Sequence, residues 1–169
     1  MDTRRLDLGL VAGLSVQSFG EPGQRTFRLL ARTEEGDVSL WLEKEQVVML
    51  GDALEELLTR IPPPGGLDPT RLSSGTPFMG ELEARVGSME LGYDRGRDGF
   101  SVIAADLMSA MPVDAIAFLA DRRQFESMRE EIETIVAASR PRCVLCGTPL
   151  TSEPHFCPPS NGHASFHEE

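Results

Sequence analysis

Two segments of the chain, 78 residues apart, carry the same spacing of apolar residues, and this repetition limits the folds that the chain can adopt. In each segment the apolar residues follow the 3.6-residue period of an α-helix, with charged residues on the opposite face. The two sets are Val47, Leu50, Leu54, Leu57 and Leu58, and Phe125, Met128, Ile132, Ile135 and Val136. The spacing therefore predicts two amphipathic helices of the same kind.

Each predicted helix follows a segment in which apolar positions recur at every second residue, the pattern of a strand. These positions are Val38, Leu40 and Leu42 before the first helix, and Ile116, Phe118 and Ala120 before the second. The junctions also match, as Glu43-x-x-Gln46 and Asp121-x-x-Gln124. The second predicts a capping box, because Asp accepts from a helix N–H while Gln reaches back. The first predicts a weaker cap, because shorter side chains than Glu are preferred there.

Two further strand patterns lie upstream of each junction. They cover about Leu6–Ser18 and Arg25–Arg32 in the first half, and about Leu82–Tyr93 and Phe100–Ala105 in the second. The halves, about 1–61 and 81–139, are separated by a linker over 62–80 whose prolines and glycines cannot continue a helix or a central strand. The sequence therefore predicts an α+β domain over 1–139. Its two strand-strand-strand-helix halves form a mostly antiparallel sheet with both helices on one face.

The composition favours a globular protein with little affinity for phosphate backbones or anionic membranes. Of the 169 residues, 16 are Lys or Arg and 27 are Asp or Glu, a formal charge of −11 that repels both. No run approaches the ~18–20 apolar residues of a membrane-spanning helix. The apolar run near the N-terminus is broken by Asp7, so we expect no signal peptide. Three cysteines supply no disulfide framework, and we expect a cytoplasmic protein.

The C-terminal segment 140–169 gathers all three cysteines and all three histidines of the chain, between Cys143 and His167. Cys143-x-x-Cys146 followed by glycine is typical of a tight turn that presents two thiolates to a metal ion. With Cys157 and one histidine it supplies the tetrahedral Cys₃His set that structural zinc prefers. We predict His163 as the fourth ligand, because it follows an Asn-Gly turn. His155 is the alternative, since its position two residues before Cys157 is awkward for joint chelation.

Two other interpretations of this tail are weaker. A redox Cys-x-x-Cys needs a helix N-terminus to lower a thiol pKa, and Gly147 and Pro149 argue against a helix. A catalytic zinc keeps one position open to water, with a carboxylate such as Glu153 as general base. Three cysteine ligands make the metal less electrophilic, so the sequence favours a structural ion.

Three segments carry a resemblance to a known family. They are Gly20-Glu-Pro-Gly-Gln-Arg-Thr-Phe27, Leu42-Glu-Lys-Glu-Gln46, and the tail with Cys143-x-x-Cys146-Gly147, Cys157-Pro158 and Asn161-Gly162-His163. In these segments the chain resembles an uncharacterised bacterial family, domain of unknown function 3090, which is best represented in actinobacteria. The resemblance covers nearly the whole chain, with Val144 where the family usually has proline. It implies a fold and a metal-binding tail, but no reaction.

The remaining candidates do not form a catalytic constellation. Glu21 and Arg25 could bind an anionic ligand in the turn 20–25, although the glycines and proline there also suit a plain turn. Residues 1–142 contain no His and no Cys, and the chain has no phosphate-binding glycine loop. We therefore expect a non-catalytic, zinc-stabilised binding or adaptor protein with a protein partner. The alternatives are an enzyme with its site between the sheet and the tail, and a nucleic-acid binder acting through the zinc knuckle.

Overall fold

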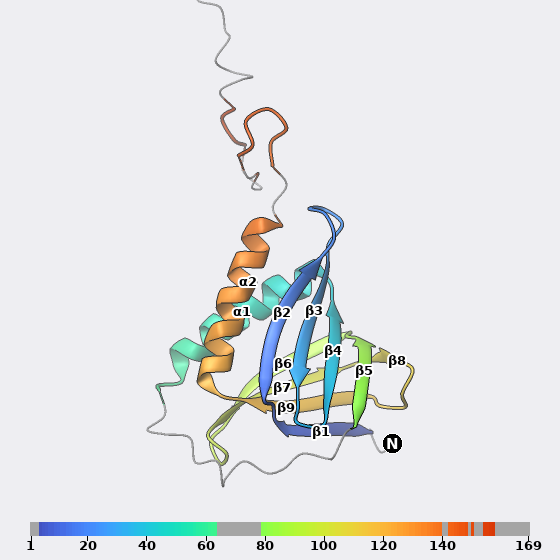
Figure 1. Ribbon diagram of the computed structural model, residues 1–169. Helices are drawn as coiled ribbons and strands as arrows, with labels where there is room; N and C mark the ends of the chain where they lie inside the picture. The colour runs from blue at the N-terminus through green and yellow to red at the C-terminus, as the bar shows by residue number, and fades with distance from the viewer. Residues whose placement is uncertain (1–3, 64–78, 140–141, 149, 151–153, 158–169) are drawn as a thin grey trace, which may run out of the picture.

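The computed structural model describes residues 4–63, 79–139, 142–148, 150 and 154–157, and these residues form an α+β fold (Figure 1). This confirms the predicted fold class. Most of the predicted linker 62–80 lies outside the described residues. The elements in chain order are β1 (Arg5–Leu10), β2 (Gly13–Phe19), β3 (Thr26–Arg32), β4 (Gly36–Leu42), α1 (Lys44–Arg60), β5 (Gly80–Arg85), β6 (Ser88–Asp94), β7 (Gly99–Ala105), β8 (Met108–Ser109), β9 (Ala115–Ala120) and α2 (Arg122–Ala138).

The strands form two mixed sheets where the sequence suggested one (Figure 1). One sheet has four strands in the order β1-β9-β7-β6, and the other has five in the order β2-β3-β4-β5-β8. Three strands of each half pair in antiparallel fashion, β2-β3-β4 in the first and β6-β7-β9 in the second, which agrees with the mostly antiparallel expectation. The fourth strand is parallel and comes from the other half: β1 pairs with β9, and β5 pairs with β4. The two halves have therefore exchanged their first strands.

The registers of the two sheets match position by position. In the five-stranded sheet, Leu29 of β3 lies opposite Val16 of β2 and Leu40 of β4. In the four-stranded sheet, Val102 of β7 lies in the same way between Leu91 of β6 and Phe118 of β9. The repeat therefore extends through the strands as well as the helices, and the short strand β8 is an addition to the second half.

Each long strand predicted from the sequence is two strands that belong to different sheets. The first breaks after Leu10 and the second after Arg85. Val11 and Val86 sit at these corners, 2% and 7% exposed, and their N–H groups donate to Leu119 O at 2.9 Å and Trp41 O at 3.1 Å. Because both corner residues are apolar and buried, the hydrophobic pattern continues through the change of sheet and hides it.

Both helices begin at the predicted junctions. The Asp121 carboxylate accepts from the Gln124 N–H at 2.8 Å, while the Gln124 Oε1 accepts from the Asp121 N–H at 2.8 Å. At the first junction Gln46 likewise accepts from the Glu43 N–H at 2.8 Å. The Glu43 carboxylate, however, forms an ion pair with Arg85 at 2.9 Å. The stronger cap thus lies at α2, as its shorter acidic residue predicts.

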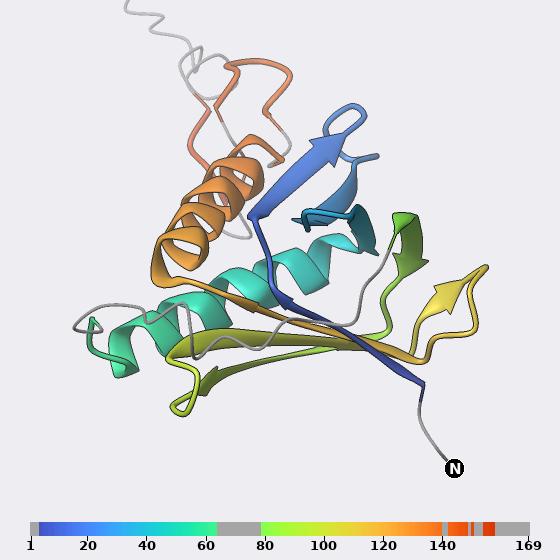
Figure 2. The same cartoon turned by 60° about the horizontal axis from the view of Figure 1, so that its bottom comes forward.

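The helices lie side by side on the inner side of the two sheets, and all layers share one core (Figure 2). α2 packs on β2, and α1 packs on β6. Each helix therefore covers the edge strand of the antiparallel set that the other half forms. The buried helix residues are among those predicted: Val47, Leu50, Leu54, Phe125, Met128 and Ile132. At the helix crossing, a Cβ on Gly51 would lie 2.9 Å from the Ile132 Cγ2 methyl group, so glycine permits the close approach. None of the described helices has the length and apolar character needed to cross a membrane.

Candidate metal centre

α2 ends at Ala138 and is capped by Ser139, and the turn residue Arg25 packs on this end. The Ser139 N–H donates to Ile135 O at 2.9 Å, and its side chain is buried. Arg25 donates from NH1 to the Ser139 hydroxyl at 3.4 Å, where its charge also complements the negative end of the helix dipole. Glu21 is exposed, and its carbonyl accepts from the Gln24 N–H at 3.0 Å, as in a turn. Among the described residues no hydrogen bond or ion pair joins Glu21 to Arg25, so the geometry favours the structural interpretation of both.

Beyond α2, the Cys143–Thr148 segment folds into a tight turn through backbone hydrogen bonds. The Gly147 N–H donates to Cys143 O at 2.8 Å, and the Cys143 N–H donates to Thr148 O at 2.8 Å. Gly147 has a φ of +71°, the left-handed region that glycine occupies without strain. Arg142 donates from NH1 to Gly147 O at 3.1 Å. This local fold places the Cys143 and Cys146 thiols on the same side of the turn, as the Cys-x-x-Cys-Gly pattern predicts.

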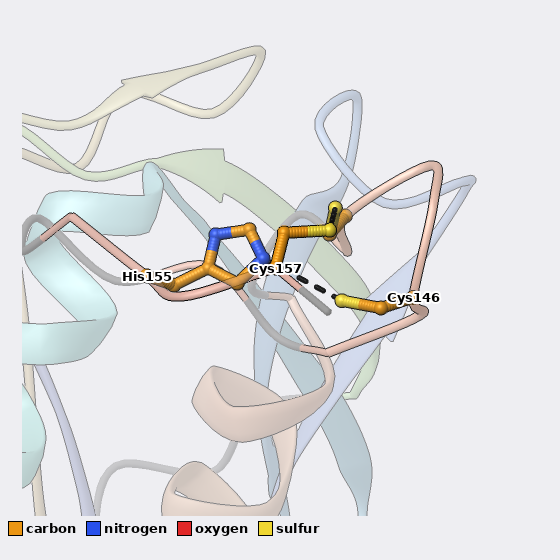
Figure 3. A group of neighbouring side chains, drawn as sticks. Cys146, His155 and Cys157 are labelled. Carbon is orange, nitrogen blue, oxygen red and sulfur yellow. Dashed lines mark hydrogen bonds between the residues drawn. The ribbon is translucent and has the colours of Figure 1, made fainter. Parts of the chain in front are cut away.

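Four potential ligands converge here: Cys143, Cys146, His155 and Cys157, whose ligand atoms all lie within 4.8 Å of one another. The Cys143 and Cys157 sulfurs are 3.7 Å apart, and the Cys146 sulfur lies 3.5 Å from His155 Nε2. Figure 3 shows the His155 ring directed at the Cys146 sulfur, with Cys157 beside it. A tetrahedron with Zn–S bonds of about 2.3 Å and a Zn–N bond of about 2.0–2.1 Å has S···S edges of about 3.8 Å and S···N edges of about 3.6 Å. The donor atoms fit one metal ion.

The surroundings of Cys146 favour its thiolate form, the form that binds metals. A hydrogen bond with the Thr148 side chain, helped by the Thr148 backbone and by His155, lowers the pKa of the Cys146 thiol to about 6. The Cys146 sulfur lies 3.2 Å from the Thr148 hydroxyl oxygen. Cys157 is 4% exposed and the other three candidate ligands are partly buried. Cys146 is therefore set up as an anionic sulfur ligand at neutral pH.

The three cysteines come together as the sequence predicts, and His155, the alternative fourth ligand, is the histidine beside them. His163 and Glu153 lie outside the described residues. Side chains two positions apart in an extended segment can face the same side, so the spacing of His155 and Cys157 does not prevent joint chelation. His155 and Cys157 face the same side here. Their spacing of two positions is the feature of the sequence that favours His155.

Comparison with known proteins gives one match. The model of the family described as "Protein of unknown function (DUF3090)" matches residues 9–157, a range that includes β2 to β9, both helices and all four candidate ligands. No curated protein and no solved structure matches the chain.

Proposed function

We propose that this chain, which belongs to the DUF3090 family, folds its tail around one structural zinc ion and acts as a binding or adaptor protein without catalysing a reaction. The observation that carries the metal site is the convergence of Cys143, Cys146, His155 and Cys157 within 4.8 Å. The matched family range ends at Cys157, so this ligand set lies within it and His163 does not.

The donor set favours zinc in a structural role. Thiolate and imidazole are the ligands of structural zinc sites, and four protein ligands leave no position for water or substrate. When bound, zinc would supply the folding energy of a segment that has little core of its own, since no described residue of the tail belongs to the shared core. Reduced cysteines of this kind persist in a reducing compartment, and the cytoplasm provides one.

The binding role is supported by apolar side chains beside the ligands. Val144 and Leu145, inside the Cys-x-x-Cys turn, are 98% and 59% exposed, and Phe156, between His155 and Cys157, is 75% exposed. Exposed apolar groups that gather on a small rigid unit mark interaction surfaces. A closed metal site flanked by such groups suits recognition of a protein partner better than it suits catalysis.

Metal analysis of the purified protein tests the site. Elemental analysis and native mass spectrometry are expected to find one zinc per chain, and cobalt substitution is expected to give the thiolate charge-transfer and visible bands of a tetrahedral site. The His155→Ala and His163→Ala variants form a matched pair. We expect His155→Ala to weaken metal binding and His163→Ala to leave it unchanged.

The opposite pattern in the histidine pair would assign the fourth position to His163 and overturn the ligand set. Protein that holds no stoichiometric metal under reducing conditions would remove the site altogether. A bound water on cobalt, seen by its exchange with added azide or thiocyanate, would contradict the structural role and support the enzyme alternative.

A further inference from the structure

The outer edge of the five-stranded sheet is closed by a side chain. β2 is the edge strand, and its Val16 N–H donates to the Glu131 carboxylate of α2 at 2.6 Å. A strand edge with free N–H and C=O groups can pair with another chain, and an acidic side chain that takes up an outward N–H prevents this pairing. Two acidic side chains, Glu130 and Glu131, line the cavity beside β2.

The matching edge of the four-stranded sheet lacks this closure. β6 is the edge strand there, and the equal registers place Leu91 where Val16 lies in β2. The position of α1 that corresponds to Glu131 is Ala53, 78 residues earlier. Within the described part of the chain, no side chain accepts a hydrogen bond from the Leu91 N–H as Glu131 does from Val16. The two halves therefore differ at the position where Glu131 closes the β2 edge, because the first half has Ala53 there.

An apolar groove of about 340 Å³ runs between α1 and β6 at this edge. Its α1 wall is formed by Met49 and Ala53, and its β6 wall by Met89 and Leu91. No charged side chain lines it, although the chain carries a net charge of −11. Met49 is 69% exposed, so the groove is open to a ligand from solution. Figure 2 shows α1 lying along the four-stranded sheet.

Acidic residues flank this groove. Glu45, Asp52 and Glu56 are exposed on the α1 face that carries Met49. Of these, only Glu56 is in an ion pair among the described residues, with Arg60 at 2.5 Å. An apolar floor with an acidic rim is complementary to an apolar segment with basic ends.

We propose that the open edge of β6 binds an extended segment of a partner protein, with apolar side chains at alternate positions and lysine or arginine at its ends. The segment adds a strand to the four-stranded sheet, so its backbone pairs with the outward N–H and C=O groups of β6. Its alternate side chains enter the groove between α1 and β6, while the basic ends meet the acidic rim. The site lies in the sheet-and-helix part and does not rest on the metal centre.

The charge distribution selects such a partner over a second copy of the chain. Pairing β6 with β6 of another molecule would bring two acidic rims together, and each molecule carries a charge of −11. A peptide with basic ends is attracted by the same rim. Basic ends also distinguish the ligand from other unfolded segments, since the apolar groove alone has little selectivity.

Fluorescence anisotropy with labelled peptides tests the proposal on the full chain. Three peptides have the length of β6 and alternate leucine with threonine. The first ends in lysines and the second in glutamates. The third ends in lysines and has a proline at its centre. We expect saturable binding of the lysine-ended peptide, weaker binding of the glutamate-ended one, and none of the proline peptide, because proline removes a ladder N–H. Added salt is expected to weaken binding of the lysine-ended peptide most.

The Ala53→Glu variant places a carboxylate where Glu131 closes the other sheet edge. It is expected to weaken binding of the lysine-ended peptide by about tenfold or more. Val48→Glu is the matched control, because it adds the same charge to the same helix on the face away from the groove. It is expected to bind like the unaltered chain, as is Cys143→Ser, which separates this site from the metal centre. Urea unfolding of each variant shows whether it remains folded.

Binding that Ala53→Glu and Val48→Glu reduce equally would overturn the proposal, and so would failure of the lysine-ended peptide to bind the unaltered chain. Sedimentation that shows a dimer abolished by Ala53→Glu would assign the edge to a second copy instead.

Discussion

The side chain of Gln124 donates a hydrogen bond from Nε2 to the backbone carbonyl of Val11, 2.9 Å away and 113 positions earlier in the chain. Gln46 makes the same contact with the Val86 carbonyl at 2.9 Å. Each glutamine also caps its own helix, and each carbonyl belongs to the corner where a chain half changes sheets. One side chain therefore joins the start of each helix to the opposite half.

Replacing Gln124 by alanine is expected to lower the free energy of unfolding by about 1–2 kcal/mol. The change removes a cap and leaves the part-buried Val11 carbonyl without its donor. Urea denaturation measures the loss. Gln124→Glu is the control, since it keeps the oxygen that accepts from Asp121 but lacks the N–H for Val11. An intermediate stability is expected, and a Glu variant as stable as the unaltered chain would show that the bridge contributes nothing.

Arg122 joins the start of α2 to the end of α1. It donates to Leu58 O at 3.3 Å and to Ile61 O, pairs with Glu126 at 3.2 Å, and stacks over Phe100 at 5.7 Å. Arg122→Met is expected to cost about 1.5–3 kcal/mol, because carbonyls lose a charged donor. Arg122→Lys keeps the charge but lacks the planar guanidinium group, so it is expected to recover only part of the lost stability. Full recovery by lysine in chemical denaturation would contradict the geometric account.

Gly51 allows the two helices to approach closely. Gly51→Ala is expected to destabilise the fold by about 1 kcal/mol, although alanine favours a helix by a similar amount, because the added methyl group meets Ile132. Ile132→Leu moves the branch away from that contact and is expected to reduce the cost of Gly51→Ala. A double-mutant cycle measures this coupling, and additive effects would argue against the contact.

Tyr93 is the single tyrosine of the chain, so its ionisation can be followed by absorbance alone. Its hydrogen bond to Asp98, with burial and the charge of Asp98, raises the pKa of the phenol above 10. The folded state favours the neutral phenol, so this contribution to stability is complete below pH 10 and is lost as the pH rises towards the folded pKa. Asparagine tolerates the φ of +53° at position 98. The Asp98→Asn variant is therefore expected to lower the pH midpoint of Tyr93 ionisation. An unchanged midpoint would exclude the charge as a cause.

Removal of the metal by a chelator is expected to affect the tail and spare the rest of the fold. Hydrogen exchange is expected to accelerate over 142–157, while the helices and sheets keep their protection, since none of the tail residues that the structure describes belongs to the shared core. Cys157→Ser is expected to give the same result without chelator. Loss of protection in α2 or in the sheets would show that the tail supports the core.

The helices and caps could be predicted because their signals are local. The 3.6-residue period around Leu50 and Met128, and the polar pairs at each junction, depend only on nearby residues. The two sheets could not be predicted, since the corners at Val11 and Val86 are as apolar as the strands around them. Which strand pairs with β1 or β5 is a contact between distant parts of the chain, and alternation alone does not encode it.

The thiol part of the candidate site was predictable from composition and spacing, because Cys143, Cys146 and Cys157 are the only cysteines. The choice of histidine depended on how the chain turns between Cys146 and His155, which sequence spacing leaves open. The open edge at β6 was beyond reach for another reason. The 78-residue repeat pairs Ala53 with Glu131, but only the structure shows that Glu131 accepts from the Val16 N–H of an edge strand.

The exchange of first strands also governs how the chain can fold during synthesis. β1 emerges from the ribosome early, but its parallel neighbour β9 follows more than a hundred residues later, at Ala115–Ala120. At translation speeds of about 5–20 residues per second, this delay lasts several seconds or longer. During that time the nascent N-terminal half has neither a complete sheet nor a partner for its leading strand. The four-stranded sheet can therefore close only after β9 has been made, so the first half depends on the second to bury its leading strand.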